Sequence, residues 1–318
     1  MSEPAYRPAP AWVSLGSRAV RLLPRGRYVL MNWLCRRAPA PFESPLGVTR
    51  GRASFVCDLR DGIAREACFM GYYEPQETVL VRGLLRPGET FVDVGANWGY
   101  FTLLAAGFVG PTGRVVSFEP HPALHALLAA NVARNRFAWA TPVRAAVADA
   151  EGELNLAGFA DGACNWGLSR LTAGADPHAP NFRVRAGLLE KMLDREGVGR
   201  VDLLKMDIEG GEGPVLPTMR GGLARGRYRR ILLELHPAAL AEQGRDARAL
   251  VELVLGFGYR AWRVDHSPAA FRRAAYRLPE GPAGFLEAFD PGRPLDRWPH
   301  LLLLAPGVEP SWREADGG

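Results

Sequence analysis

The chain of 318 residues has a formal charge of +5 and a mean hydropathy of −0.08. Its hydrophobic content of 47% is enough to bury a sizeable core, and no apolar run approaches the ~20 residues that a membrane-spanning helix needs. Residues 1–52 carry nine Arg and two acidic residues, a net charge of +7, which leaves −2 for the remainder. The main body is therefore not a basic surface for nucleic acid, and we expect no nucleic-acid partner.

The four cysteines show neither a C-x-x-C pair nor metal-ligand spacing; they are Cys35, Cys57, Cys68 and Cys164. A chain of this length does not need disulfide staples, so free thiols in a reducing compartment are expected. Tyr28–Cys35 is apolar, but it is short, lies late for a signal peptide and precedes two arginines rather than a cleavage site. The sequence therefore predicts a cytoplasmic protein.

Residues 1–69 are predicted to form a basic extension ahead of the catalytic domain. Trp12–Arg37 has helical spacing that Pro24 and Gly26 interrupt, so two short helices are expected. Their apolar side either packs on the chain's own domain, which we favour, or makes a weak peripheral contact with a membrane surface. Ala38–Pro45 is expected to be a turn-rich joint.

The following segment leads into a domain that we assign to residues 70–306, with 307–318 as a tail. Val48–Asp58 is rich in strand formers and is predicted to form a strand pair. Arg65–Arg86 has helical character, and Pro87-Gly88 ends it as a breaker pair just before an apolar strand.

Glu89–Pro120 has the pattern of a strand, a glycine turn, a helix and a second strand. The first strand contains Phe91–Val94, and its apolar run is typical of a strand buried on both faces of a parallel sheet. A helix is expected over Tyr100–Phe108 and the second strand over Arg114–Phe118. Glu119 follows it at the carboxyl edge, where open α/β sheets bind ligands.

The turn itself favours one nucleotide cofactor over another. A dinucleotide turn has the spacing G-x-G-x-x-G, whereas here Ala96 and Asn97 lie between Gly95 and Gly99. Asp93 just upstream would repel a pyrophosphate but could hold an ammonium group, directly or through water. The Asn97 amide could bind a carboxylate, and Glu119 could accept hydrogen bonds from ribose hydroxyls. Together with Asp93, these residues fit S-adenosylmethionine better than NAD. A structural turn without a ligand is the alternative.

The next elements lead to a third strand end. His121–Arg136 is predicted to be a helix, and Thr141–Ala148 a strand that ends in Asp149. This carboxylate either accepts the exocyclic amine of an adenine or is a plain turn residue. Glu153–Phe159 alternates as a further strand, and Ala160–Asn181 is a long irregular loop, which we expect to face the substrate through Asn165, Trp166 or His178.

A second informative stretch runs from Val201 to Glu212. An apolar strand ends in Lys205, and in a strand Lys205, Asp207 and Glu209 point to one face. Such charges at the end of a buried strand are costly unless they are paired or functional. Arg229–His236 is another strand, in which Glu234 and His236 project the same way.

The remaining pattern completes an α/β fold. The ranges are a short helix at Gly187–Glu196, a helix at Ala238–Gly256, a strand at Tyr259–Asp265, an irregular insertion at Pro268–Pro299 and a last strand at His300–Ala305. Five alternating βα units, a sixth strand and a last strand inserted antiparallel beside it fit a class I methyltransferase (Rossmann-like) sheet, mostly parallel with an antiparallel last strand, plus an N-terminal extension.

At this point the sequence resembles the FkbM-type methyltransferase family over about residues 70–260. The motifs that carry the resemblance are Tyr73-Glu74-Pro75, Asp93-Val94-Gly95-Ala96-Asn97-Trp98-Gly99 followed by Thr102, Phe118-Glu119-Pro120, Lys205-Met206-Asp207-Ile208-Glu209-Gly210 and Leu233-Glu234-Leu235-His236. The resemblance implies S-adenosylmethionine as cofactor and O-methylation of hydroxyls on sugars, lipids or natural products. It also implies that Glu74, Thr102 and Asp207 join the cofactor residues already named.

Methyl transfer to an aliphatic hydroxyl needs a base, because such a hydroxyl is a poor nucleophile near neutral pH. Asp207, Glu209 and His236 are the candidates. We favour His236, whose ordinary pKa of ~6.5 suits the task, oriented by Glu234 or Glu209; the alternative is that His236 caps a helix. Asp207, Glu209 and Glu234 could also hold Mg²⁺, although a metal is not the default.

Two rival functions come from other classes. One is an NAD-dependent oxidoreductase, which the glycine turn and Asp93 disfavour. The other is a catalytically silent scaffold that binds S-adenosylmethionine without transferring its methyl group.

Overall fold

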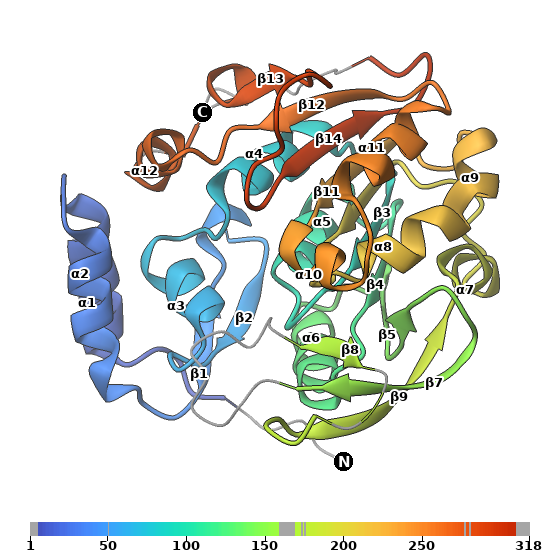
Figure 1. Cartoon of the computed structure of the whole chain (residues 1–318). Coiled ribbons are helices and arrows are strands. Elements are labelled where there is room, and N and C mark those ends of the chain that lie inside the picture. The colour runs from blue at the N-terminus through green and yellow to red at the C-terminus, as the bar shows by residue number, and fades with distance from the viewer. Residues whose placement is uncertain are drawn as a thin grey trace.

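The computed structural model describes residues 6–49, 51–158, 169–172, 174, 176–276, 278–279 and 281–309 (Figure 1). In this part of the chain, eight strands form one mixed sheet with the order β13-β12-β14-β11-β10-β3-β4-β5. They are β3 (Thr90–Val94), β4 (Arg114–Phe118), β5 (Ala140–Val143), β10 (Leu203–Met206), β11 (Arg230–Glu234), β12 (Arg260–Val264), β13 (Leu286–Ala288) and β14 (His300–Leu304).

The topology confirms the predicted class I methyltransferase sheet. Strands β5, β4, β3, β10 and β11 pair in parallel, whereas β14 is antiparallel to both of its neighbours, β11 and β12. The predicted strand, turn, helix and strand around Glu89–Pro120 are β3, α5 (Tyr100–Val109) and β4. The sheet therefore brings the ends of β3, β4, β10 and β11 to one edge.

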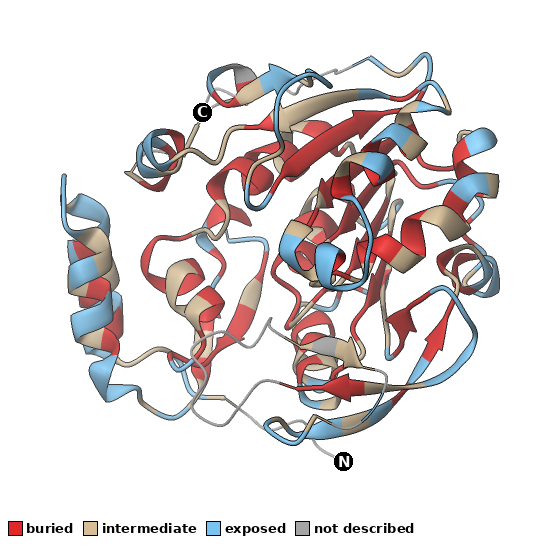
Figure 2. Ribbon diagram, viewed as in Figure 1, coloured by how far each residue is buried: buried red, intermediate tan, exposed pale blue. Residues whose placement is uncertain are grey.

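Helices cover both faces of this sheet. On one face lie α4 (Pro75–Leu84), α5 and α6 (Pro122–Arg134), and on the other lie α7 (Leu189–Arg195), α8 (Glu212–Val215), α9 (Arg220–Ala224), α10 (Pro237–Glu242) and α11 (Ala247–Leu255). Because side chains alternate along a strand, Phe91 packs into the first hydrophobic cluster and its neighbour Val92 into the second. The buried residues in Figure 2 follow these two layers.

The N-terminal segment contains α1 (Ala11–Leu22), α2 (Arg27–Leu34), β1 (Phe42–Pro45), β2 (Ser54–Cys57) and α3 (Gly62–Phe69). The two predicted short helices are confirmed. The predicted strand pair exists, but its first strand lies in the segment expected to be a turn-rich joint, and Val48 is in a 3₁₀ turn. The prolines near this strand suggested turns, yet proline is tolerated in an edge strand. The helical stretch predicted over Arg65–Arg86 is the two helices α3 and α4.

Two predicted single elements are each divided in the structure. The strand expected over Thr141–Ala148 is β5 and β6 (Ala146–Val147), which belong to different sheets. The helix expected over Ala238–Gly256 is α10 and α11, separated at Gly244, whose φ is +67°. Pro142 lies just before the first break and Gly244 at the second, so each break has a local breaker residue that the prediction did not use.

A second, four-stranded sheet has the order β6-β9-β7-β8. Its other strands are β7 (Gly152–Ala157), β8 (Arg170–Thr172) and β9 (Asn181–Gly187). The loop predicted over Ala160–Asn181 thus contains a short strand, while Asn165, Trp166 and Cys164 lie outside the described residues. His178 is exposed.

The segment Pro268–Pro299, expected to be irregular, contains α12 (Pro268–Tyr276) and β13. Helix α12 packs beside α4, and the Tyr72 hydroxyl donates a hydrogen bond to the Ala275 carbonyl at 3.1 Å. The 3₁₀ helices are η1 (Cys35–Arg37), η2 (Gly47–Thr49), η3 (Leu216–Met219) and η4 (Pro282–Gly284). None of the described helices combines the length and the apolar character that crossing a bilayer requires.

Candidate functional site

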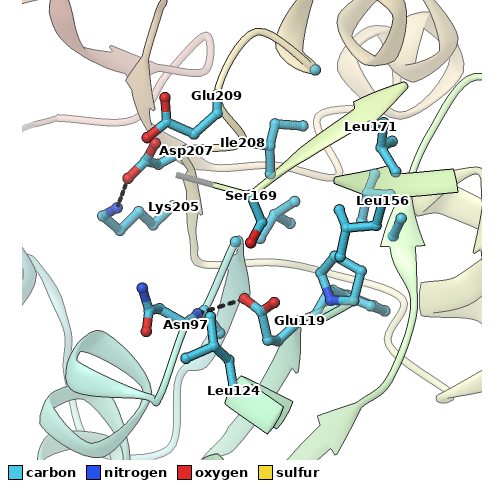
Figure 3. A pocket seen from close by; sticks show the side chains of 18 of the residues that line it. Asn97, Glu119, Leu124, Leu156, Ser169, Leu171, Lys205, Asp207, Ile208 and Glu209 are labelled. Atoms are coloured by element: carbon cyan, nitrogen blue, oxygen red, sulfur yellow. Dashed lines mark hydrogen bonds and ion pairs between the residues drawn. The ribbon is translucent and has the colours of Figure 1, made fainter. Parts of the chain in front are cut away.

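A cavity of about 300 Å³ opens at the carboxyl ends of β3, β4 and β10. Figure 3 shows Asn97 and Glu119 on one side of it, and Lys205, Asp207 and Glu209 on another. Apolar side chains complete the lining, among them Tyr73, Phe101, Leu124, Leu156, Leu171 and Ile208. The cavity thus combines an apolar wall with a few convergent polar groups, as small-molecule sites do.

The glycine turn after β3 is required for packing between two loops. Gly95 has a φ of +89°, and a Cβ atom there would lie 1.9 Å from the Asp207 carbonyl oxygen. At Gly99, with a φ of +100°, a Cβ atom would lie 2.6 Å from a methyl group of Leu128. The glycines therefore let the turn lie against the loop after β10 and against α6. Gly95 and Ala96 line the cavity, whereas Gly99 packs against α6.

Glu119 is held by backbone donors at the end of β4. Its two carboxylate oxygens accept hydrogen bonds from the Asn97 and His121 amides, each at 2.8 Å. Burial raises the pKa of Glu119 to about 7, and the two amides oppose that shift. Because each carboxylate oxygen has two lone pairs, acceptor capacity remains toward the cavity. A pair of ribose hydroxyls fits this arrangement.

Asp93 and Thr102 lie behind the cavity wall. Thr102 is fully buried, and its hydroxyl donates to Asp93 at 2.7 Å. Asp93 stands opposite Lys205 in the register of β3 and β10. Burial raises the pKa of Asp93 to about 6, with Lys205 acting against the shift. Asp93 and Thr102 therefore lie under the glycine turn and do not line the cavity.

Two other predicted cofactor residues also lie off the cavity surface. Glu74 precedes α4 with a φ of +41°, next to the cavity-lining Tyr73. One of its carboxylate oxygens is buried without a hydrogen-bond partner among the described residues. Asp149 is exposed in the turn after β6, outside the set of lining residues.

The end of β10 brings Lys205, Asp207 and Glu209 together on the cavity wall. The Lys205 ammonium lies 3.3 Å from an Asp207 oxygen and 4.7 Å from the centre of the Phe101 ring. Burial opposes the charge of Lys205, but Asp207 and other carboxylates raise its pKa above the ordinary range. Lys205 is therefore a permanent cation within a group of acids.

His236 lies behind this wall and contacts several carboxylates. Its Nδ1 atom is 3.2 Å from Glu212, and its Nε2 atom is 3.3 Å from Glu209, 3.6 Å from Glu234 and 3.9 Å from Asp207. Burial disfavours the imidazolium, but the hydrogen bond to Glu212 and the surrounding charges raise the pKa of His236 to about 9. His236 is therefore a cation near neutral pH.

Glu209 and Glu234 hold protons more tightly than ordinary carboxylates. Burial, followed by the charge of Asp207, raises the pKa of Glu209 to about 7 and that of Glu234 to about 10. Both side chains therefore accept a proton more readily than an exposed glutamate does. Of the two, Glu209 lines the cavity.

Four residues at this edge were missed by the sequence analysis: Glu77, Glu212, His266 and His300. Glu212 is fully buried and accepts hydrogen bonds from the Ile208 and Gly210 amides at 2.9 and 3.0 Å. Its position two residues after Gly210 fits a carboxylate that closes a turn, which was the only sequence signal. It fixes the loop that carries Asp207 and Glu209.

The other three missed residues extend the charged cluster away from the cavity. His300 lies between Glu234, at 3.4 Å, and Glu77, at 3.0 Å. Glu77 also contacts His266 at 2.6 Å. Burial acts against the Glu77 charge, yet the two histidines hold its pKa well below the usual range. These residues come from α4, β14 and the segment after β12, so no local motif joins them.

Within the described part of the chain, three groups of acids and histidines have ligand atoms close enough to share an ion: Glu74, Asp207 and Glu234; Asp207, Glu212 and His236; Glu77, His266 and His300. The first group contains Asp207 and Glu234, two of the three residues that the sequence predicted as Mg²⁺ ligands, but not the third, Glu209. Lys205 and His236 already supply positive charge to these acids, so Mg²⁺ remains a secondary prediction.

A family model described as the methyltransferase FkbM domain matches residues 93–261. The chain is 27% identical over 202 residues to 31-O-demethyl-FK506 methyltransferase FkbM of Streptomyces tacrolimicus. This alignment covers 55% of this chain and 74% of that protein. The chain is also 28% identical over 211 residues to AMB antimetabolite synthetase AmbE of Pseudomonas aeruginosa. That alignment covers 55% of this chain but only 10% of the much longer synthetase.

Among solved structures, the chain resembles methyltransferase FkbM from Methylobacillus flagellatus KT, with 15% identity and a TM-score of 0.41. That match covers 90% of this chain and 62% of the other. The family match begins at Asp93 and includes the glycine turn, Glu119 and the Lys205–Gly210 motif.

Proposed function

The chain belongs to the FkbM family of S-adenosylmethionine-dependent methyltransferases, and we propose that it methylates a hydroxyl group of a sugar, lipid or natural-product acceptor. The observation that carries this proposal is the placement of Glu209 on the cavity wall, beside Asp207 and Lys205. A relative is named as a methyltransferase for 31-O-demethyl-FK506, and this supports oxygen as the methylated atom.

The residues around the glycine turn fit the methyl donor. Glu119 offers free acceptor capacity for the two ribose hydroxyls, while Asn97 and the backbone of Gly95 and Ala96 face the same cavity. Bound S-adenosylmethionine supplies an activated methyl group on a sulfonium centre. Leu124 and Leu156 provide apolar contact area on the adjoining wall.

We assign the general base to Glu209. A carboxylate whose pKa is about 7 accepts a proton more readily than an ordinary one and is still half ionised at neutral pH. Glu209 would take the proton of the acceptor hydroxyl, while bound S-adenosylmethionine would supply the methyl group through cleavage of its S–CH3 bond and leave as S-adenosylhomocysteine. His236 is already protonated, so it is poorly suited to be the base that the sequence analysis favoured.

His236 instead acts as a positioning residue for Glu209. Its imidazolium lies 3.3 Å from Glu209 and 3.2 Å from the buried Glu212. The cation keeps the Glu209 pKa from rising further, and the contact with Glu212 fixes the ring. Lys205 plays the corresponding part for Asp207 at 3.3 Å.

The test uses S-adenosylmethionine with a radioactive methyl group and fractionated extracts of small molecules and lipids. We expect label in a fraction that survives mild base, because a methyl ether is stable there and a methyl ester is not. Glu209→Gln should abolish the transfer while S-adenosylhomocysteine still binds in calorimetry. A matched control is Glu242→Gln, an exposed acid on α10.

Three results would contradict the proposal. Base-labile label would indicate a carboxyl acceptor, and full transfer by Glu209→Gln would remove this residue as the base. Binding of S-adenosylmethionine with no transfer to any fraction would favour the silent scaffold. The cytoplasmic location is part of the same proposal, and cell fractionation tests it.

A further inference from the structure

The α1–α2 hairpin, residues 11–37, carries an exposed apolar face. Among the described residues, six large hydrophobic side chains are exposed, and five of them belong to this hairpin. They are Trp12, Leu15, Leu22, Val29 and Trp33, between 38% and 83% exposed. Single exposed hydrophobic residues are ordinary, but a group of them on one small element marks an interaction site.

This face is distinct from the one that holds the hairpin on the molecule. The inward stripe of α1 is Val13, Gly16 and Val20, and Gly16 packs against Leu34 and Phe69. The spacing of Trp12, Leu15 and Leu22 places them along a second stripe of the same helix. The packing that the fold needs is therefore complete without the outer residues, and Figure 2 shows exposed residues alternating with buried ones along the hairpin.

Two arginines anchor the hairpin on the rest of the molecule. Arg21 donates hydrogen bonds to the Phe69 and Cys68 carbonyls at 3.0 and 2.9 Å. Arg27 donates to the Tyr276 carbonyl at 2.8 Å. The turn end of the hairpin, where α1 ends and α2 begins, is thus tied to α3 and α12.

The charge of this segment has a single sign. Residues 6–42 contain seven Arg and no Asp, Glu or Lys. The exposed ones among them are Arg7, Arg18, Arg21, Arg25, Arg36 and Arg37. The rest of the chain is mildly acidic in composition, so the positive charge is concentrated in the segment that also carries the exposed apolar side chains.

We propose that the α1–α2 hairpin docks the protein on the surface of an anionic phospholipid bilayer. Trp and Leu side chains enter the interfacial region, while arginines contact lipid phosphates. A second copy of the chain fits this face less well, because pairing two hairpins would bring arginines against arginines. The proposal stands apart from the methyl-transfer chemistry and does not depend on it.

The experiment is co-sedimentation of the full-length protein with two kinds of vesicle, phosphatidylcholine alone and phosphatidylcholine mixed with phosphatidylglycerol. We expect binding to the mixed vesicles only, and weaker binding at high salt. Leu15→Glu with Trp33→Glu should abolish it. Arg18→Glu with Arg25→Glu should lower the partition coefficient by at least about tenfold.

Matched controls separate the hairpin from general charge and stickiness. Trp298→Glu alters the one exposed large hydrophobic residue outside the hairpin in the described chain, and Arg220→Glu with Arg297→Glu makes the same change in net charge elsewhere. Both should bind vesicles as the unmodified protein does. Circular dichroism and binding of S-adenosylhomocysteine establish that each variant is folded.

Several outcomes would overturn the proposal. One is the absence of binding to the mixed vesicles, and another is equal loss of binding in the hairpin and control variants. A concentration-dependent dimer that Trp33→Glu dissociates, without vesicle binding, would assign the face to a second copy. Binding to soluble polyglutamate but not to vesicles would assign it to an acidic protein.

Discussion

The two polar sides of the cavity are built in different ways. On the glycine-turn side, defined by Gly95, Ala96, Asn97 and Glu119, the carboxylate is held by two backbone amides within a short stretch of chain. On the lysine-acid side, defined by Lys205, Asp207 and Glu209, the acids are balanced by cations from several elements. The glycine-turn side therefore depends on local backbone geometry. The lysine-acid side depends on a balance of charges that come from separate parts of the chain.

The largest expected effect comes from breaking the contact between these two sides. Gly95→Ala places a Cβ atom 1.9 Å from the Asp207 carbonyl in addition to straining a φ of +89°. We expect a loss of more than about 3 kcal/mol in the free energy of unfolding, or failure to fold. Urea unfolding followed by circular dichroism measures it.

Gly244→Ala is the matched control, because its φ is +67° and its Cβ position has open space. It should cost only about 1–2 kcal/mol, from backbone strain alone. Equal losses in the two variants would mean that the close approach of the two loops is unimportant.

The next effect tests the lysine-acid side alone. Glu212→Gln turns a buried acceptor into a group with an N–H donor facing the Ile208 and Gly210 amides or His236. We expect about 2–4 kcal/mol of lost stability, because a buried hydrogen-bonded charge is removed from its partners. The exposed Glu242→Gln should change stability by no more than about 0.5 kcal/mol. Similar unfolding curves for both variants would contradict this role.

The pH dependence of stability tests the charge on His236. Its folded pKa of about 9 lies above the ordinary value of 6.5, so protonated His236 stabilises the fold. This contribution is complete below pH 6.5 and is lost as the pH rises through 9. The stability difference between the natural protein and His236→Gln should shrink by about 3 kcal/mol from pH 6 to pH 10.

Unfolding at a series of pH values, with NMR titration of the His236 ring, measures this effect. The control is His178→Gln, since His178 is exposed in the turn before β9; its stability difference should not vary in this way. An NMR midpoint for His236 near its ordinary pKa would instead restore it as a candidate base.

The smallest effects separate the two sides by function. Glu119→Gln should weaken S-adenosylhomocysteine binding by about tenfold or more, because one of the two acceptor oxygens is replaced by an N–H donor. Glu209→Gln should change it by less than about threefold, since Glu209 acts on the acceptor side. Asp149→Asn should change it even less, because Asp149 is exposed away from the cavity. Calorimetry decides, and equal losses in all three variants would contradict the division.

Local sequence was a reliable guide where one stretch of chain builds the whole feature. The strand, turn and helix around Gly95 were predicted closely because apolar runs and glycines determine them over a few residues. Prediction was poorer for β1, for the separation of β5 from β6, and for α12 and β13. Strand β1 depends on pairing with the nearby β2, whereas the others depend on partners distant in the chain; in each case hydrogen bonding or packing with the partner outweighs local propensity.

The same distinction applies to the charged groups. The sequence alone identified Glu119 at a strand end and the acids around Lys205, because parallel strands end at a common edge. It did not reveal that Glu77 and His300 join this cluster, or that His236 is surrounded by carboxylates. Only the tertiary structure decided their protonation, because a pKa depends on burial and on charges that the fold brings close.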